Sequence, residues 1–155
     1  MSDSLWFPMF VDLSGQRALV VGAGEVAARR IATLARFCRD IVVVAPSAKP
    51  EVEALVEKGG IALRRRAYAP EDLDGVDIVL ACTDDAALNA DIARACRCRG
   101  IPVNASSDHT LCDFFFPGVA IRDSVVVGVT AGGRDHRGAR AVTERIREML
   151  DSEDR

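Results

Sequence analysis

The sequence lacks a charge excess of one sign, a long apolar run and a recognisable secretory signal. Its net charge of −3 gives no overall positive field, so we expect no nucleic-acid partner. No uninterrupted apolar run reaches the roughly 20 residues of a membrane span, so we expect no membrane insertion. The opening residues, MSDSLWFPMF, lack the basic and continuous apolar regions of a signal peptide, so we expect a cytoplasmic location.

The sequence also lacks the cysteine and histidine patterns of a disulfide framework or a metal site. Its five cysteines are odd in number and irregularly spaced, which predicts reduced thiols. Cys96 and Cys98 form a C-x-C pair, but residues two apart on a helix do not share a face. Because no second pair completes a set of four ligands, we expect no metal site.

The apolar fraction of 49% is typical of a globular protein with a real core, and strand and helix patterns alternate through the first two thirds of the chain. The short apolar runs that we expect to be buried strands are 17–22, 40–46, 61–68, 77–83 and 101–104. The segments with helical spacing or helix boundary signals are 25–37, 50–60 and 85–100. This order predicts an α/β fold with a Rossmann-like, doubly wound parallel sheet.

The pattern changes after Pro117. Two apolar runs joined by a turn at residues 122–124 predict a hairpin, and a charged helix is expected over 137–150. Val142, Ile146 and Met149 or Leu150 would form a narrow apolar stripe on that helix. We therefore expect an NAD-binding domain of residues 1–113 and a hairpin-and-helix part of residues 114–155. The latter is too small to stand alone and would pack on the sheet or on a second subunit.

A G-x-G-x-x-A fingerprint follows the first strand and opens the first helix, which is the context that dinucleotide binding requires. Gly22 permits the tight turn, Gly24 lets the backbone approach a pyrophosphate, and Ala27 allows close packing of helix on strand. The free N–H groups of the helix N-terminus would then face the phosphates. We expect cofactor contacts from Gly22, Ala23, Gly24, Glu25 and Val26. The alternative is a glycine-containing turn without a ligand.

Two further loops reach the same edge of the sheet. The second strand ends at Ala45 and Pro46, where an acidic residue would bind the adenosine ribose, so Pro46 and Ser47 are expected to supply that contact. Lys49 is the only nearby cation for a 2′-phosphate, which favours NAD over NADP. After the fourth strand, Thr83 and Asp84 are expected to touch the cofactor, to cap the next helix, or to do both.

The stretch VNASSDHTLCDFFFP, residues 103–117, leaves the fifth strand and places Asp108 beside His109. The two are either an acid/base pair at the carboxyl edge of the sheet or only a turn before the next strand. The position of Asp108, on the side where a nicotinamide should lie, favours it as a base.

The segments FPMFVDLSGQRALVVGAGEVAARR, VVVAP, ACTDDAALN, GIPVNASSD, LCDFFFP and GVTAGG occur in this order. Together they resemble the NAD-dependent precorrin-2 dehydrogenases, the N-terminal module of siroheme synthases, over residues 7–148. The resemblance implies oxidation of precorrin-2 to sirohydrochlorin, with NAD⁺ accepting the hydride, by a homodimer that associates through its C-terminal part. The family usually carries a further helical segment, so we expect this chain to be a short form.

The resemblance also assigns site residues, with two departures. The family keeps its proposed catalytic aspartate three residues after the asparagine that matches Asn104; here that position is Ser107, and the carboxylate stands next to it. We therefore expect Asp108 to be the catalytic residue. The second departure is Asp135, where the family often has serine. The residues expected on the substrate side are Asn104, Ser107, His109, Arg134 and Asp135.

Two other functions stay open. Some family members insert ferrous iron into sirohydrochlorin, so ferrochelatase activity, added or alone, is one alternative. A non-catalytic module that binds NAD or a tetrapyrrole is the other.

Overall fold

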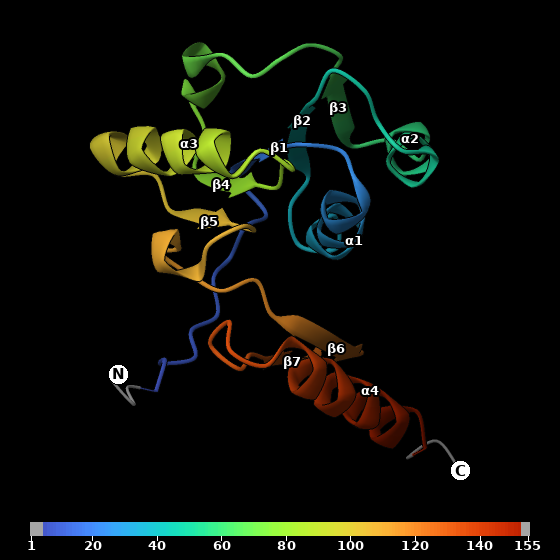
Figure 1. Ribbon diagram of the computed structural model, residues 1–155. Helices are drawn as coiled ribbons and strands as arrows, with labels where there is room; N and C mark the ends of the chain where they lie inside the picture. Colours follow the sequence, from blue (N-terminus) through green and yellow to red (C-terminus); the bar gives the residue numbers. More distant parts are fainter. Residues whose placement is uncertain (1–4, 153–155) are drawn as a thin grey trace. The chain divides into compact units, whose positions relative to one another are not determined.

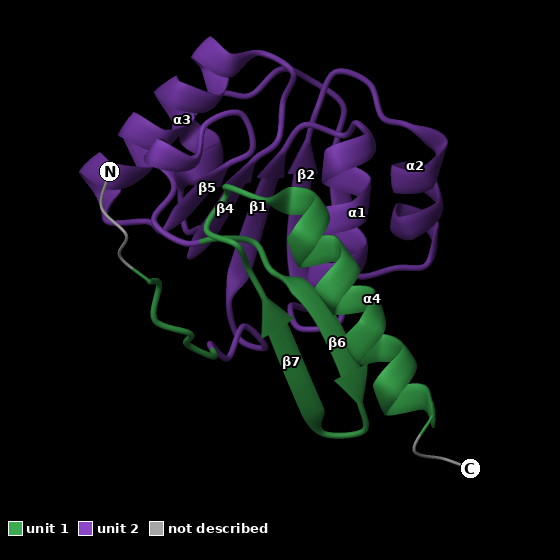
Figure 2. Cartoon of the chain, turned by 60° about the horizontal axis from the view of Figure 1, so that its bottom comes forward, with its two compact units in different colours: residues 1–10, 115–155 green, residues 11–114 purple. Residues whose placement is uncertain are grey.

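The computed structural model describes residues 5–152, which divide into two compact units (Figures 1 and 2). The sheet unit is residues 11–114, and the hairpin unit combines residues 5–10 with residues 115–152. The chain thus leaves the sheet unit after Phe114, one residue beyond the expected boundary. Residues 5–10 belong with the C-terminal part, although the sequence analysis grouped them with the sheet.

The sheet unit is built on five parallel strands in the order β3-β2-β1-β4-β5. Their bounds are β1 Arg17–Val21, β2 Asp40–Val44, β3 Ile61–Arg64, β4 Ile78–Ala81 and β5 Val103–Ala105. The predicted doubly wound parallel sheet is confirmed. Since β2 lies on one side of β1 and β4 on the other, the strand order reverses at β1, and that reversal is where such sheets bind ligands.

Helices cover both faces of this sheet (Figure 1). Helices α1, Glu25–Leu34, and α2, Pro50–Glu57, pack together on one face, and α3, Ala86–Arg99, covers the other. Alternate strand residues serve the two sides, so Leu19 and Val21 join a buried cluster with Ile92 and Cys96 of α3. Burial on both faces explains why the strands read as continuous apolar runs.

Several elements end earlier than their sequence patterns indicate, and β3 and α1 are two of them. Strand β3 stops at Arg64, because the following residues leave the sheet for a 3₁₀ turn at Pro70–Leu73. Helix α1 stops at Leu34, and it buries Ala27, Ala28, Ile31 and Leu34. Val26, on the first turn of α1, is 37% exposed.

The hairpin unit contains β6, Gly118–Arg122, paired antiparallel with β7, Val125–Val129, and helix α4, His136–Ser152. Asp123 makes the tight turn with a φ of 52°. Helix α4 contacts both strands and buries Thr143. The predicted stripe is split, because Ile146 and Leu150 are half-buried whereas Val142 and Met149 are exposed. The predicted hairpin and helix are confirmed as elements.

Candidate functional site

The glycine loop between β1 and α1 has the geometry of a phosphate cradle. Gly22 has a φ of 106°, and a Cβ there would lie 2.5 Å from the carbonyl oxygen of Cys82, so no side chain fits. A Cβ on Gly24 would meet nothing within 4 Å, so this backbone faces open space. No side chain caps the N-terminus of α1, which leaves the N–H groups of its first turn for a ligand.

The loop after β2 is tied to the glycine loop. The backbone N–H of Lys49 donates to the carbonyl of Ala23 over 3.0 Å, which holds the intervening residues beside the cradle. Pro46 and Ser47 in this loop are exposed. Both therefore lie in the loop held beside the glycine loop, and their contact with an adenosine ribose stays a prediction.

Strand pairing brings Arg64 beside this loop, which no local sequence pattern indicated. The N–H of Ala45 donates to the carbonyl of Arg64, since β2 and β3 are neighbours. The Arg64 and Arg66 side chains bind the buried carboxylate of Asp72 at 3.0 and 2.5 Å, and Arg65 binds Glu53. These arginines are half-exposed but engaged in ion pairs.

The loop after β4 is organised by α3. The Asp85 carboxylate caps α3 by accepting from the N–H groups of Ala87 and Leu88, so the capping role expected of Thr83 or Asp84 belongs to their neighbour. Thr83 instead binds Asn89, with its N–H 3.1 Å and its Oγ1 2.7 Å from Asn89 Oδ1. The exposed Asp84 side chain makes no hydrogen bond or ion pair with residues 5–152, so it is open to a ligand.

The loop after β5 contains the proposed acid/base residue. Asp108 caps the 3₁₀ turn at His109–Leu111: its Oδ1 accepts from the N–H and the Oγ1 of Thr110 at 2.8 and 2.7 Å. The Thr110 hydroxyl and then its N–H lower the pKa of Asp108. Its Oδ2 accepts no hydrogen bond from the described residues. Ser107 and His109 are exposed beside it, and Ser107 Oγ accepts from Asn89 Nδ2 over 3.1 Å.

Asn104, expected on the substrate side, is buried within the sheet unit. Its Oδ1 accepts from Arg30 of α1 over 2.5 Å, and its Nδ2 donates to the carbonyl of Phe114 over 2.8 Å. Arg30 also donates to the Cys82 thiol. Asn104 therefore uses its amide within the sheet unit, where it links α1 to Phe114 at the end of that unit.

Arg134 and Asp135 lie in the hairpin unit and are exposed. Asp135 Oδ1 accepts from the N–H of Gly138 over 2.8 Å, and its carbonyl accepts from Ala139, so it begins α4. The other predicted site residues all lie in the sheet unit.

Two residues that organise this edge were not singled out from the sequence. Asn89 is fully buried on α3 and contacts both the β4 and the β5 loop. Arg30 of α1 donates to Cys82, which follows β4, and to Asn104 of β5. A buried polar residue on an otherwise apolar helix face was the available signal for Asn89.

The two thiols of the C-x-C pair do not share a site. Cys96 is buried in the core and Cys98 is exposed on the other side of α3, so the C-x-C pair is divided as expected. Burial raises the pKa of the Cys82 and Cys112 thiols. In the part of the chain from 5 to 152, no group of three His, Cys, Asp or Glu side chains could hold a metal ion.

Among residues 5–152, no helix has both the length and the apolar character needed to cross a membrane.

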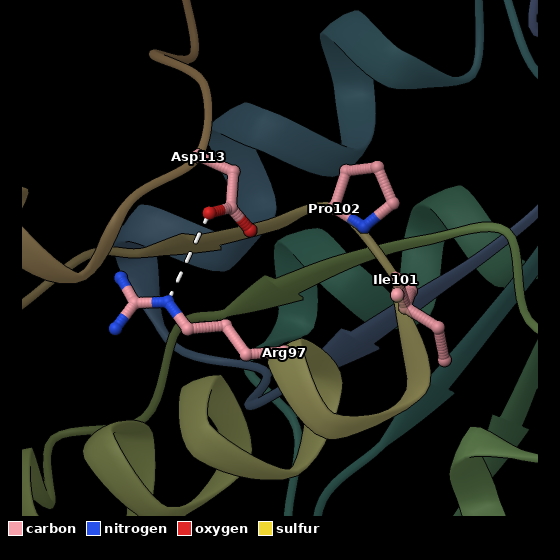
Figure 3. A pocket seen from close by; sticks show the side chains of 5 residues that line it. Arg97, Ile101, Pro102 and Asp113 are labelled. Carbon is pink, nitrogen blue, oxygen red and sulfur yellow. Dashed lines mark ion pairs between the residues drawn. The ribbon is translucent and has the colours of Figure 1, made fainter.

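A shallow hollow of about 290 Å³ lies elsewhere in the sheet unit (Figure 3). It is lined by Arg97, Gly100, Ile101, Pro102 and Asp113. Arg97 Nε and Asp113 Oδ1 are 3.9 Å apart across it. Since these residues stand where α3 ends and β5 begins, the hollow is at the amino ends of the strands, opposite the glycine loop. It is therefore not the cofactor site.

Comparison with known proteins agrees with the nucleotide-binding role that the glycine loop indicates. Residues 9–118 match the family described as "Putative NAD(P)-binding". The siroheme synthase of Pseudomonas aeruginosa is 40% identical over 147 residues, which cover 95% of this chain and 32% of that protein. The siroheme synthase of Methylococcus capsulatus is 37% identical over 147 residues, covering 95% of this chain and 31% of that protein. The chain thus spans about a third of the length of these relatives.

A solved structure shares the fold. The precorrin-2 dehydrogenase SirC superposes with a TM-score of 0.80 at 24% identity, covering 92% of this chain and 70% of that one. This confirms the Rossmann-like sheet with a following hairpin and helix. The predicted resemblance to siroheme synthases is confirmed by the 37–40% identity over 95% of this chain.

Proposed function

We propose that this chain, which belongs to the NAD(P)-binding family matched above, oxidises precorrin-2 to sirohydrochlorin in siroheme biosynthesis. The carrying observation is an open, uncapped glycine loop in a chain 40% identical to a siroheme synthase over nearly its whole length. A nicotinamide cofactor bound there supplies a hydride acceptor. The protein's own residues must then hold the two reactants and accept a proton.

The residues at the carboxyl edge fit a dinucleotide. The space in front of Gly24 and the free N–H groups of α1 suit a pyrophosphate. Pro46 and Ser47 border the adenosine side, while Thr83 and Asp84 border the side toward β4 and β5. Glu25 and Val26 are exposed at the first turn of α1, next to the phosphates. Ala23 holds the loop after β2 in place through Lys49.

NAD⁺ is the cofactor that we propose, rather than NADP⁺. The arginines near Ala45 are already paired with Asp72 and Glu53, so a 2′-phosphate would have to break these pairs. Lys49 is the remaining cation in the loop. Titrating the protein with NAD⁺ and with NADP⁺ tests this choice. Tighter binding of NADP⁺ that is lost in Lys49→Ala would show that NADP⁺ is the cofactor.

We propose Asp108 as the base, with the free Oδ2 as the proton acceptor. Its lowered pKa keeps the carboxylate ionised at neutral pH, so the acid limb of the pH profile of turnover should lie below the usual range of an aspartate. Asp108→Asn keeps an oxygen for the Thr110 contacts but removes the base. We expect kcat to fall about 100-fold with unchanged thermal stability.

Thr110→Ala is the matched control, since it loosens the cap and leaves the carboxylate. Equal losses in both variants would show that Asp108 serves the turn alone. His109, exposed on the same turn, is proposed only as a neighbour of the substrate.

The test of the function itself uses purified protein, precorrin-2 and NAD⁺, with NADH and sirohydrochlorin followed by absorbance. Wild type should form both in equal amounts. Gly24→Ala should fold normally, because its Cβ meets no neighbour, yet lose turnover, because the Cβ occupies the space for the pyrophosphate. A folded wild type that binds NAD⁺ and forms no NADH from precorrin-2 would refute the proposal.

We further propose that the chain acts as a homodimer through the hairpin unit, in the cytoplasm. Val125, Val142 and Met149 of this unit are at least 47% exposed, and a second copy would cover such apolar side chains. Arg134 and Asp135, in the same unit, are proposed to meet the substrate carboxylates. Arg134 would attract these carboxylates, and Asp135 would repel them. Sedimentation at several protein concentrations tests the dimer.

A further inference from the structure

The amide of Asn89 is fully buried, and all four of its hydrogen-bonding positions are used. Asn89 Oδ1 accepts from the N–H of Thr83 at 3.1 Å and lies 2.7 Å from the Oγ1 of Thr83. Asn89 Nδ2 donates to the carbonyl of Thr83 at 3.0 Å and to Ser107 Oγ at 3.1 Å. Three of these contacts fix the loop after β4, and the fourth fixes the loop after β5. A single side chain therefore sets the relative position of the two loops.

The contact with Ser107 also holds its Oγ and restricts the direction of its hydroxyl. Because Ser107 Oγ accepts from Asn89 Nδ2, which has no lone pair to receive a proton, the serine hydrogen points elsewhere. Ser107 is exposed, and its hydroxyl donates to no atom of residues 5–152. Its hydroxyl is left as a donor at the carboxyl edge, suited to a carboxylate or carbonyl oxygen.

We infer that Asn89 is a positioning residue that holds Thr83 toward the cofactor and Ser107 as a donor toward an anionic oxygen of the substrate. This rests on the proposed dehydrogenase function. At position 107 the resembling family has its proposed catalytic aspartate. In this chain Ser107 binds the substrate instead, and the neighbouring Asp108 accepts the proton. Asn89 acts through both loops without touching either reactant.

The two loops predict a separation of effects. Ser107→Ala should leave the Kd for NAD⁺ within twofold of wild type and lower kcat about tenfold, the effect of one hydrogen bond made in the transition state. Thr83→Ala should raise the Kd for NAD⁺ about fivefold. Asn89→Ala should do both. Ser107→Thr and Thr83→Ser keep the hydroxyls and should restore each property.

Since Asn89 is buried, its alanine variant could fail to fold, and a second variant covers that case. Thr83→Ala combined with Ser107→Ala removes the two partners from exposed or half-buried positions and leaves the core filled. It should reproduce the combined phenotype. Adding Asn89→Ala to it should leave kcat unchanged, because the Ser107 hydroxyl is already gone, but should raise the Kd further, because Asn89 still binds the N–H and carbonyl of residue 83 in the double variant.

The measurements are NAD⁺ binding by calorimetry and steady-state turnover of precorrin-2, with thermal unfolding of each variant. Wild-type Kd in Asn89→Ala or Thr83→Ala, or wild-type kcat in Ser107→Ala, would overturn the inference. If wild type binds NAD⁺ but does not oxidise precorrin-2, the proposed function fails and the role of Ser107 fails with it. The Kd values then still decide the Thr83 part.

Discussion

The sheet unit and the hairpin unit differ in how much of themselves they bury. Every buried apolar residue from 5 to 152 except Ala120 lies in the sheet unit. In the hairpin unit Ala120 and Thr143 are the described residues that are buried. A parallel sheet covered on both faces closes its own core, whereas a two-stranded hairpin with one helix leaves apolar side chains exposed. The first unit therefore buries its own core, whereas the second leaves exposed the apolar side chains that the proposed second copy would cover.

The largest effect should come from filling the tightest glycine of the sheet unit. In Gly22→Ala the new Cβ meets rigid backbone at Cys82, and the φ of 106° is strained for alanine. We expect the free energy of unfolding to fall by about 4 kcal/mol in urea titrations.

Two matched variants calibrate this effect. Gly59→Ala has a similar φ of 91° and open space, so it should lose only about 1 kcal/mol. In the hairpin unit, Gly118→Ala meets the side chain of Thr143 and no backbone atom among its nearest neighbours. A greater loss in Gly118→Ala than in Gly22→Ala would contradict the contrast between the units.

The next effect concerns the buried carboxylate of the sheet unit. The Arg66 side chain, with help from the N–H of Ala69 and from Arg64, lowers the pKa of Asp72 from 3.8 to about 2. The folded protein therefore binds this proton less readily than the unfolded chain. The stability it contributes, about 2 kcal/mol, is complete above pH 4 and is lost as the pH falls through 2.

Urea titrations of wild type and Asp72→Asn from pH 6 to pH 2 measure this contribution. The difference between them should shrink across the acid end of that range. Glu144→Gln, which breaks the exposed pair with Arg147 in the hairpin unit, should cost less than about 0.5 kcal/mol. An Asp72 difference that stays constant with pH would show that the pair is not the source.

A smaller effect is the dependence of each unit's free energy of unfolding on protein concentration. If a second copy covers the hairpin unit, a tenfold dilution should lower its free energy of unfolding by about 1.4 kcal/mol and leave the sheet unit unaffected. Hydrogen exchange resolved by segment measures both in one sample. Equal dependence in the two units, or none in either, would contradict the proposed division.

The smallest effect uses the cysteines, which all lie in the sheet unit. Burial raises the pKa of Cys96 to about 11, whereas Cys98 is exposed. Alkylation at pH 8 should modify Cys98 and spare Cys96 until the sheet unit unfolds, with no change in stability. Labelling of Cys96 at conditions where only the hairpin unit has opened would show that the two units are coupled.

The sequence predicted most of the sheet unit because its elements follow local rules. Continuous apolar runs, a proline at the start of α2 and Gly100 in the left-handed conformation at the end of α3 each act within a few residues. The glycine fingerprint was found for the same reason. The grouping of residues 5–10 with the hairpin unit depends on distant contacts, such as Trp6 edge-on to Phe115 at 4.5 Å, and no local pattern indicates it.

The details of the site were less accessible. The cap at Asp85, the exposure of Val26 and the approach of Arg64 to Ala45 depend on loop conformation and strand pairing. Asn89 is a polar residue on a helix, and only the folding of two loops against it gives it partners. Periodicity assigns residues to faces, but it does not say which loops meet.

The membership of residues 5–10 in the hairpin unit makes the sheet unit an insertion within it. Residues 11–114 emerge from the ribosome before β6, β7 and α4 do, so the sheet unit can fold while the chain is still being synthesised. The segment containing Trp6 must wait for Phe115 and the residues after it. Nascent chains halted at increasing lengths should therefore resist proteolysis in the sheet unit first, with protection of the N-terminal segment arriving last.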